Sequence, residues 1–252
     1  MKSAHLTLTF STLLCAIAFF GSDLPSQAES FLVENGQSRA QIVIAPDPPR
    51  MTRLAAEELQ LHIEKMSGAK LPVVSGTATR QPVSVYVGRS AHTEERGITA
   101  DGLSNGAFRM VSGEDWLVLL GNDEEFSPAA FEPSVPERMQ PPDGEITWDK
   151  LTDGMWGNPV GSMKRGYSNR MDIWAKDNRG SLNAVYEFLR SHGVAWYMAG
   201  ELGSVIPEKT TIPLPQVDRV VRPDFGLRLM FSMSSSLFSQ PPEELLWMLR
   251  LG

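Results

Sequence analysis

Acidic side chains are the residues of this chain whose types and spacing come nearest to a known chemistry. Hydrolysis of a glycosidic bond uses two carboxyl groups, one of which has a raised pKa in a partly apolar setting. The candidates lie in the middle of the chain and are Asp123, Glu124, Glu125, Asp149, Asp153 and Asp172. Their spacing does not place any two of them across a sugar, and we expect most of them to be solvated in loops. We therefore assign no catalytic residue.

Two histidines and a glutamate raise the question of a metal site. Glu58 and His62 lie four residues apart on an expected helix, a spacing that two metal ligands use. The sequence shows no third ligand at a metal-binding spacing and no HExxH motif, so we expect a solvated helix face instead. His192 falls at the end of a second expected helix, where a protonated imidazole would favour the helix dipole. Gly-rich phosphate loops, GxSxG elbows and DxDxDG loops are not found, so the sequence predicts neither a metal site nor a cofactor site.

Aromatic residues in a proline-rich stretch are the remaining candidates for contact with a ligand. They are Trp148, Trp156, Tyr167 and Trp174, and Asp, Asn, Arg and Gly residues stand between them. Flat aromatic faces beside polar groups suit stacking on sugar rings. The plainer interpretation is that these rings fix a long loop to the domain, and we favour it.

Residues 1–28 predict an export signal. Lys2 supplies a positive charge, residues 6–20 form an apolar run, and Ser26-Gln27-Ala28 is a small-x-small cleavage site. We expect cleavage after Ala28 and a secreted or periplasmic product, with a retained N-terminal anchor as the alternative. Cys15 is the single cysteine and would leave with the signal, so the mature chain would have no thiol and no disulfide.

The charge balance limits the classes of partner. The net charge is -7, and the sequence contains no run of basic residues. An acidic chain of this kind is not suited to nucleic acid or to an anionic membrane surface. We expect neither as a partner once the signal is removed.

Hydrophobic periodicity predicts a strand, a helix and further strands in the first half of the chain. A β-branched run at 41–45 precedes a helix that Asp47 caps and Pro48 begins. The apolar face of this helix carries Met51, Ala55, Leu59, Ile63 and Met66. We expect its other face to meet water through Arg53, Glu57, Glu58, Gln60, Glu64 and Lys65. Gly68 ends the helix, and strands are expected at 71–74, 82–87, 108–111 and 116–120, the last two as a hairpin.

The second half begins with a stretch of unusual composition. Residues 122–178 are rich in proline and show no sustained period, so we interpret them as an insertion. A second helix follows, with Gly193 at its left-handed end and an apolar face formed by Leu182, Val185, Tyr186 and Leu189. Short strands are expected at 194–197, 204–206 and 210–214, and 216–223 reads as a linker. The order of strands and helices predicts an α/β fold (an α+β layer), in which two helices pack on one face of a mixed sheet.

The last residues suggest the start of another unit. Residues 227–233 form a new apolar run, and an amphipathic, Leu-rich helix begins near Pro241. A strand and an apolar helix with nothing left to pack on are typical of the first unit of a second domain. We therefore expect a domain at 29–222, followed at 223–252 by the first unit of a second domain that is cut short.

Two segments carry a resemblance to known proteins. They are LAAEELQLHIEKMSGAKLPV at 54–73 and RGSLNAVYEFLRSHGVAWYMAGELGSVIP at 179–207. Together they resemble the N-terminal domain of alpha-glucuronidases of glycoside hydrolase family 67 and the similar second domain of family 20 beta-hexosaminidases. The chain is most similar to exported bacterial glycoside-hydrolase-like proteins that join this domain to a barrel. The resemblance extends over most of the mature chain up to about residue 222, and it implies that residues 223–252 are the first unit of a truncated (β/α)8 barrel.

The resemblance implies an accessory function. In those families a mixed sheet with two helices on one face precedes a (β/α)8 barrel, and the barrel holds the catalytic carboxylates. No family catalytic residue has a matching position here. The resemblance thus implies a non-catalytic domain of an exported glycoside-hydrolase-like protein of carbohydrate breakdown, with the barrel as its partner and oligo- or polysaccharide as a further candidate partner. A stand-alone carbohydrate-binding module and an exported interaction domain without a sugar ligand are the alternatives.

Overall fold

Six strands form the central sheet. The computed structural model describes residues 29–79, 81–125, 177–225 and 242–252. The strands are β3 (Ala40–Ile44), β4 (Val73–Ser75), β5 (Val83–Val87), β6 (Phe108–Ser112), β7 (Trp116–Gly121) and β13 (Asp218–Val221), in the spatial order β13-β6-β7-β5-β3-β4. The strands β4, β3, β5 and β7 run parallel, whereas β6 and β13 run antiparallel. The sheet is therefore mixed, and β6 and β7 form the expected hairpin.

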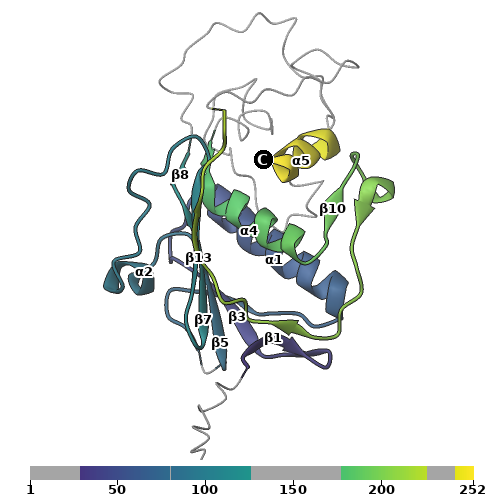
Figure 1. Cartoon of the computed structure of the whole chain (residues 1–252), viewed down its shortest axis with the longest axis horizontal. Coiled ribbons are helices and arrows are strands. Elements are labelled where there is room, and N and C mark those ends of the chain that lie inside the picture. The colour runs from purple at the N-terminus through teal and green to yellow at the C-terminus, as the bar shows by residue number, and fades with distance from the viewer. Residues whose placement is uncertain (1–28, 80, 126–176, 226–241) are drawn as a thin grey trace, which may run out of the picture.

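Two long helices cover one face of this sheet. The helices are α1 (Arg50–Ser67) and α4 (Gly180–Ser191), which pack against each other and against the sheet (Figure 1). All apolar residues of the two predicted helix faces are buried in one core with the strands. Gly68 and Gly193 follow the two helices with φ of 74° and 93°. Glycine adopts this left-handed region readily because it has no Cβ atom to clash with the backbone. Both helix ends therefore agree with the sequence.

The opposite face of the sheet has a smaller core of its own. Side chains alternate along each strand, so Val43, Tyr86, Val118 and Leu120 point away from α1 and α4 and form this second cluster. A short helix, α2 (Ala91–Glu95), lies at this face and begins with a capping box between Ser90 and Thr93. Sequence periodicity did not reveal α2, because one and a half turns are too short to show a helical period.

Three small antiparallel sheets complete the architecture. β1 (Phe31–Glu34) lies between β2 (Gln37–Ser38) and β12 (Ile212–Pro213); β10 (Ala195–Trp196) pairs with β11 (Ser204–Val205), which follows the 3-10 turn η4 (Glu201–Gly203); and β8 (Asp123–Glu124) pairs with β9 (Asn178–Arg179). The strands expected at 204–206 and 210–214 thus exist: the first pairs with the nearby β10, and the second pairs with β1, which is distant in the sequence.

The expected linker at 216–223 is wrong. Residues Asp218–Val221 form β13, which pairs along its whole length with β6, from Asp218 opposite Val111 to Val221 opposite Phe108. The segment contains exposed and charged residues because β13 is an edge strand. Its strand character comes from the free edge of β6, which supplies the hydrogen bonds, rather than from any local apolar pattern.

The expected final helix is present, and it packs against the rest of the domain. α5 (Pro242–Leu251) lies on the side of the α1–α4 layer that faces away from the sheet (Figure 1). Leu249 is buried in the main core, and the Trp247 indole Nε1 donates to the Trp196 carbonyl at 3.0 Å. The expectation of an apolar helix with nothing to pack on is therefore corrected. The truncated barrel is not confirmed, since α5 packs back onto the domain and residues 226–241 lie outside the described ranges.

Candidate functional site

One edge of the sheet brings together the starts of both long helices. The carboxyl ends of the parallel strands β5 and β7 meet the first turns of α1 and α4 there. The Gly121 N–H donates to the Ser181 hydroxyl at 2.9 Å, and the Gly180 N–H donates to the Asn122 carbonyl at 3.1 Å. Gly88, just after β5, lies against Thr52 of α1. Ligand sites of α/β proteins are commonly found at this edge of the sheet, so we take it as the candidate site.

Distant carboxylates, and no local side chains, cap the two helices at this edge. The Arg50 N–H at the start of α1 donates to Glu125 Oε1 at 2.8 Å, and the Ser181 N–H of α4 donates to Asp123 Oδ1 at 2.9 Å. Neither helix has a side-chain cap from its own N-cap residue. The expected cap by Asp47 is therefore wrong: the helix begins after Pro49, and the carboxylate that satisfies its free N–H comes from residue 125.

A buried ion pair between Arg50 and Asp177 lies at the same edge of the sheet. The Arg50 guanidinium donates from Nε and Nη2 to the two carboxylate oxygens of Asp177, each at 2.5 Å. The two side chains are 6% and 0% exposed. Through its backbone and its side chain, Arg50 thus holds both Glu125 and Asp177. We call Arg50, Asp123, Glu125 and Asp177 the Arg50 cluster.

The Arg50 cluster stands at the two ends of one chain segment. Asp123 pairs with Arg179, and Glu124 pairs with Asn178, in the β8–β9 ladder. The Asn178 side chain also donates to Glu124 Oε2 at 3.2 Å. Residues 126–176 leave and re-enter the described structure at this ladder. The two ends of the predicted insertion are thus paired with each other and bonded to both long helices.

Two glycines permit the close approach of β7 and α4 beside the cluster. A Cβ atom added to Gly121 would lie 2.3 Å from the Gly180 Cα, and one added to Gly180 would lie 2.7 Å from the Gly121 Cα. These are backbone contacts that no side-chain rotation relieves. The two positions therefore require glycine, and through them β7 holds the start of α4 within reach of Asp123.

The electrostatics of Asp123 differ from those of an exposed carboxyl. The residue is partly exposed, but its carboxylate is enclosed between the Ser181 backbone and the Thr52 hydroxyl, which donates to Oδ2 at 2.9 Å. Burial raises the pKa of Asp123 to about 6, although the hydrogen bonds from Ser181 and Thr52 lower it in part. Near neutral pH the group is close to its titration range, which is the behaviour of a carboxyl held in a desolvated setting.

Asparagine at position 123 should remove a pH dependence of stability. The pKa of Asp123 is raised from 3.8 to about 6 in the folded state. The protonated carboxyl therefore contributes to stability in full below about pH 4, and this contribution is lost as the pH rises through 6. Relative to Asp123→Asn, the wild type should lose about 1–2 kcal/mol of unfolding free energy between these limits, after allowance for solvent screening. Urea unfolding from pH 4 to 8 measures it. Glu124→Gln, an exposed neighbour, serves as the control, and parallel curves for Asp123→Asn and wild type would refute the assignment.

The carboxylates singled out in the sequence have different positions from those expected. Asp123 and Glu125 cap helices, and Glu124 bonds Asn178, so none of these three is simply solvated in a loop. The remaining carboxylates, Asp149, Asp153 and Asp172, lie outside the described residues. So do the four aromatic candidates, Trp148, Trp156, Tyr167 and Trp174.

Glu58 and His62 are buried, and the expectation of a solvated helix face is wrong for both. Each side chain is 1% exposed. The Glu58 carboxylate accepts two hydrogen bonds from Arg250 of α5, and the His62 Nδ1 lies 2.7 Å from the Glu58 carbonyl. Burial lowers the pKa of His62, so the ring is neutral at pH 7. Among the residues that the structure describes, no three His, Cys, Asp or Glu side chains are grouped in a way that would hold a metal ion.

Two further histidines, His92 and His192, pack against aromatic rings. His92 stacks on Tyr86 with ring centroids 3.8 Å apart, on the sheet face away from α1 and α4. His192 contacts Phe188 edge to face, and burial, together with the charge of Lys209, lowers the pKa of His192 to about 4. A neutral imidazole does not act as a cation at the end of α4, so the helix-dipole interpretation of His192 is wrong at neutral pH.

A group of exposed apolar residues lies in the connection between β10 and β11. Tyr197, Met198 and Leu202 are 75%, 57% and 99% exposed. They follow Trp196, which is buried. Neighbouring exposed apolar residues of this kind often mark a protein contact.

Sequence reasoning missed Arg50, Thr52, Ser181 and Asp177. Arg50 and Asp177 are 127 residues apart, and an ion pair over that separation leaves no periodic pattern. One local signal existed: neither long helix has a satisfactory cap at its observed start, so its first N–H groups require partners from elsewhere.

The comparisons with known proteins yield likenesses to solved structures only, 15 chains in all. No family model matches the chain, and no curated protein matches it. Among solved structures, the chain is similar to a family GH115 4-O-methyl-alpha-glucuronidase with specificity for decorated arabinogalactans, with a TM-score of 0.40 and 17% identity. The matched region covers 73% of this chain and 18% of that protein. Within the described ranges, no helix is long and apolar enough to cross a membrane.

Proposed function

We propose that residues 29–222, together with α5, form a non-catalytic accessory domain of an exported glycoside-hydrolase-like protein, and that this domain holds the 126–176 segment against carbohydrate. The single observation that carries the proposal is the Arg50 cluster. A buried ion pair and two carboxylate caps fix both ends of one segment to both long helices. Long segments that a domain holds in this way usually have a function of their own.

The contacts of the described carboxylates support a non-catalytic function. A general acid or nucleophile needs a free path to its substrate. Asp123, Glu125 and Glu58 instead accept hydrogen bonds from Ser181, Arg50 and Arg250. The resemblance of segments 54–73 and 179–207 to accessory domains supports the same function, and it implies a barrel as partner. The export part of the proposal rests on the expected signal at 1–28.

The aromatic residues Trp148, Trp156, Tyr167 and Trp174 are the part of the 126–176 segment that we propose to stack on sugar. Their types suit this contact, since flat apolar faces alternate with polar neighbours. Affinity should be weak, because the loss of freedom of the ligand and of the stacked side chains offsets part of the binding free energy.

Titration with xylo- and chito-oligosaccharides, followed by tryptophan fluorescence, tests the proposal. Trp156→Ala and Trp174→Ala should each weaken binding by about 1 kcal/mol, or about fivefold in Kd. Trp116→Phe is the matched control, because Trp116 packs on the sheet face away from α1 and α4. Binding that survives both alanine substitutions would place the sugar site elsewhere.

The same protein should release no product from aryl glucuronides or aryl N-acetylhexosaminides. Turnover that a single carboxylate substitution abolishes would contradict the non-catalytic part of the proposal. The absence of any sugar binding would favour the alternative of an interaction domain. The exposed Tyr197, Met198 and Leu202 are the observation that favours this alternative, since they offer an apolar surface to a partner protein.

A further inference from the structure

The Glu58 carboxylate is buried, and its two bonds of normal geometry to a side chain come from one distant residue, Arg250. Arg250 donates from Nε to Glu58 Oε2 at 2.8 Å and from Nη2 to Oε1 at 2.9 Å. Two parallel bonds of this kind match the fork of a guanidinium group and not the point charge of an ammonium group. The contact is therefore selective for guanidinium by geometry.

An aromatic wall stands beside the carboxylate. The Trp196 ring contacts His62 and Tyr186 edge to face, with centroids 5.3 Å away in both cases. The Arg250 Cζ lies 5.7 Å from the Trp196 ring centroid, and the Arg190 Cζ lies 5.9 Å from it. A cation beside an indole gains electrostatic attraction from the ring, so the wall and the carboxylate favour the same kind of group.

The ionised state of the Glu58 carboxylate depends on Arg250. Burial alone raises the pKa of Glu58, but the charge and hydrogen bonds of Arg250 bring it below its ordinary value. His62 is neutral because burial lowers its pKa, and burial raises the pKa of Tyr186 well above its ordinary value. Without a guanidinium at this place, Glu58 would be a buried carboxylate without a bonded cation among the described residues, which is strongly unfavourable.

The site has more hydrogen-bonding capacity than Arg250 uses. The Tyr186 hydroxyl and the Trp196 Nε1 are buried and, among the described residues, have no hydrogen-bond partner of normal geometry. Buried polar atoms of this kind are rare in native proteins and call for an explanation. A core that needed only to bury α5 would be better served by apolar side chains. These atoms indicate a binding site that α5 fills incompletely.

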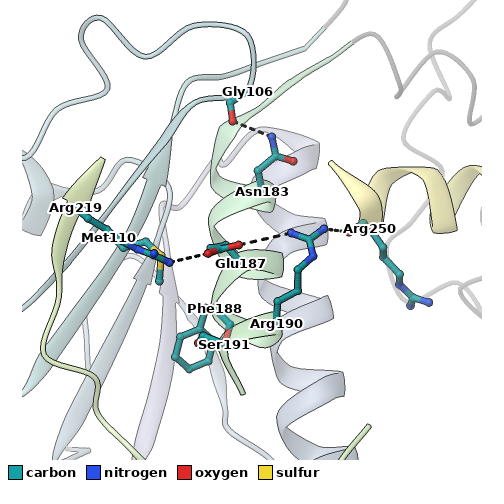
Figure 2. A network of polar contacts seen from close by, with 9 residues as sticks. All are labelled: Gly106, Met110, Asn183, Glu187, Phe188, Arg190, Ser191, Arg219 and Arg250. Atoms are coloured by element: carbon teal, nitrogen blue, oxygen red, sulfur yellow. Dashed lines mark hydrogen bonds and ion pairs between the residues drawn. The ribbon is translucent and has the colours of Figure 1, made fainter. Parts of the chain in front are cut away.

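The last turn of α5 is recognised by its backbone as well as its side chain. The Arg190 guanidinium donates to the Arg250 carbonyl, while the Arg250 side chain points away from Arg190 (Figure 2). In turn, Glu187 accepts ion pairs from Arg190 and from Arg219 of β13 (Figure 2). Arg190 is therefore held in place from the sheet side and presents its guanidinium to the end of α5.

We propose that Glu58, Tyr186 and Trp196 form a guanidinium-binding site that Arg250 fills within the chain, and that this site binds a guanidinium group from outside the chain when the Arg250 side chain is absent. The chemistry of the ligand class is a planar, bidentate cation. A small guanidinium ion and an arginine side chain of another chain both provide it. This site is separate from the Arg50 cluster, so its test does not depend on carbohydrate binding.

The experiment is chemical rescue of full-length Arg250→Ala with methylguanidinium. The substitution should lower Tm, and methylguanidinium should raise the Tm of the variant in a saturable manner. At a concentration ten times its Kd, the ligand should lower the unfolding constant about tenfold. The Tm of the wild type should not rise, because Arg250 occupies the site. Methylammonium at the same concentration should give no rescue, since it lacks the fork.

The carboxylate supplies the decisive control. Arg250→Ala combined with Glu58→Gln should lose the rescue, whereas Arg250→Ala combined with Glu64→Gln should keep it, because Glu64 lies partly exposed on the same helix. Rescue that survives Glu58→Gln, or equal rescue by methylammonium, would overturn the proposal. If Arg250→Ala does not fold by itself, its refolding yield from urea with and without methylguanidinium gives the same comparison.

A peptide of residues 242–252 distinguishes the two sources of the ligand. Rescue by methylguanidinium alone means that the site takes a small ion in place of the deleted side chain, with α5 still docked. Rescue by the peptide as well means that an arginine on a helix of another chain displaces the variant α5. Either result supports a guanidinium site, and failure of both ligands contradicts it.

Discussion

Replacing Arg50 by alanine is expected to lower the free energy of unfolding by about 3–5 kcal/mol, the usual effect of removing one member of a buried ion pair. The substitution leaves the Asp177 carboxylate, which is fully buried, without its bidentate partner. Equilibrium urea unfolding measures the loss. Arg53→Ala is the matched control, since Arg53 is exposed on the same helix, and it should change stability by less than about 0.5 kcal/mol.

A charge-free pair separates the electrostatic effect from packing. Arg50→Met with Asp177→Leu removes both charges together and should recover most of the lost stability, as buried pairs often do when apolar residues replace both members. Hydrogen exchange gives a local readout. The amides of Gly180 and Ser181, which bond Asn122 and Asp123, should exchange faster in Arg50→Ala. If Arg50→Ala lowers the free energy of unfolding by less than about 1 kcal/mol and leaves the exchange of these amides unchanged, the Arg50 cluster does not hold the two ends of the segment as proposed.

Alanine at position 121 should lower the free energy of unfolding by about 3 kcal/mol, at the upper end of ordinary overpacking. The added Cβ would meet the Gly180 Cα at 2.3 Å and the Ser181 N at 2.8 Å. Both are backbone atoms, so either β7 or the start of α4 must move. That movement would also draw Ser181 away from Asp123. Thermal and urea unfolding report the loss of stability.

Gly68→Ala provides the contrast for this prediction. Gly68 has a positive φ of 74°, but a Cβ there would meet nothing within 4 Å. Its cost should be limited to the strained backbone, about 1 kcal/mol. If the two alanine variants lose the same stability, contact between β7 and α4 does not explain the requirement for glycine at position 121.

The sequence alone determined the elements whose signals are local. The apolar faces of α1 and α4 follow a helical period, and Gly68 and Gly193 end these helices in the left-handed conformation. The hairpin of β6 and β7 also followed from its turn residues and its two apolar runs. In each case the deciding physics acts between residues a few positions apart, so the order of residues is enough to state it.

The tertiary structure decided every feature that depends on a distant partner. Glu58 looked like a solvated residue because its helix position is polar, and only Arg250, 192 residues later, explains its burial. Residues 218–221 are a strand because β6 offers a free edge. The helix starts take their caps from 123–125, and α5 packs where the sequence offered no partner. Burial, pairing and pKa are properties of what surrounds a group in space, and local sequence patterns do not encode those surroundings.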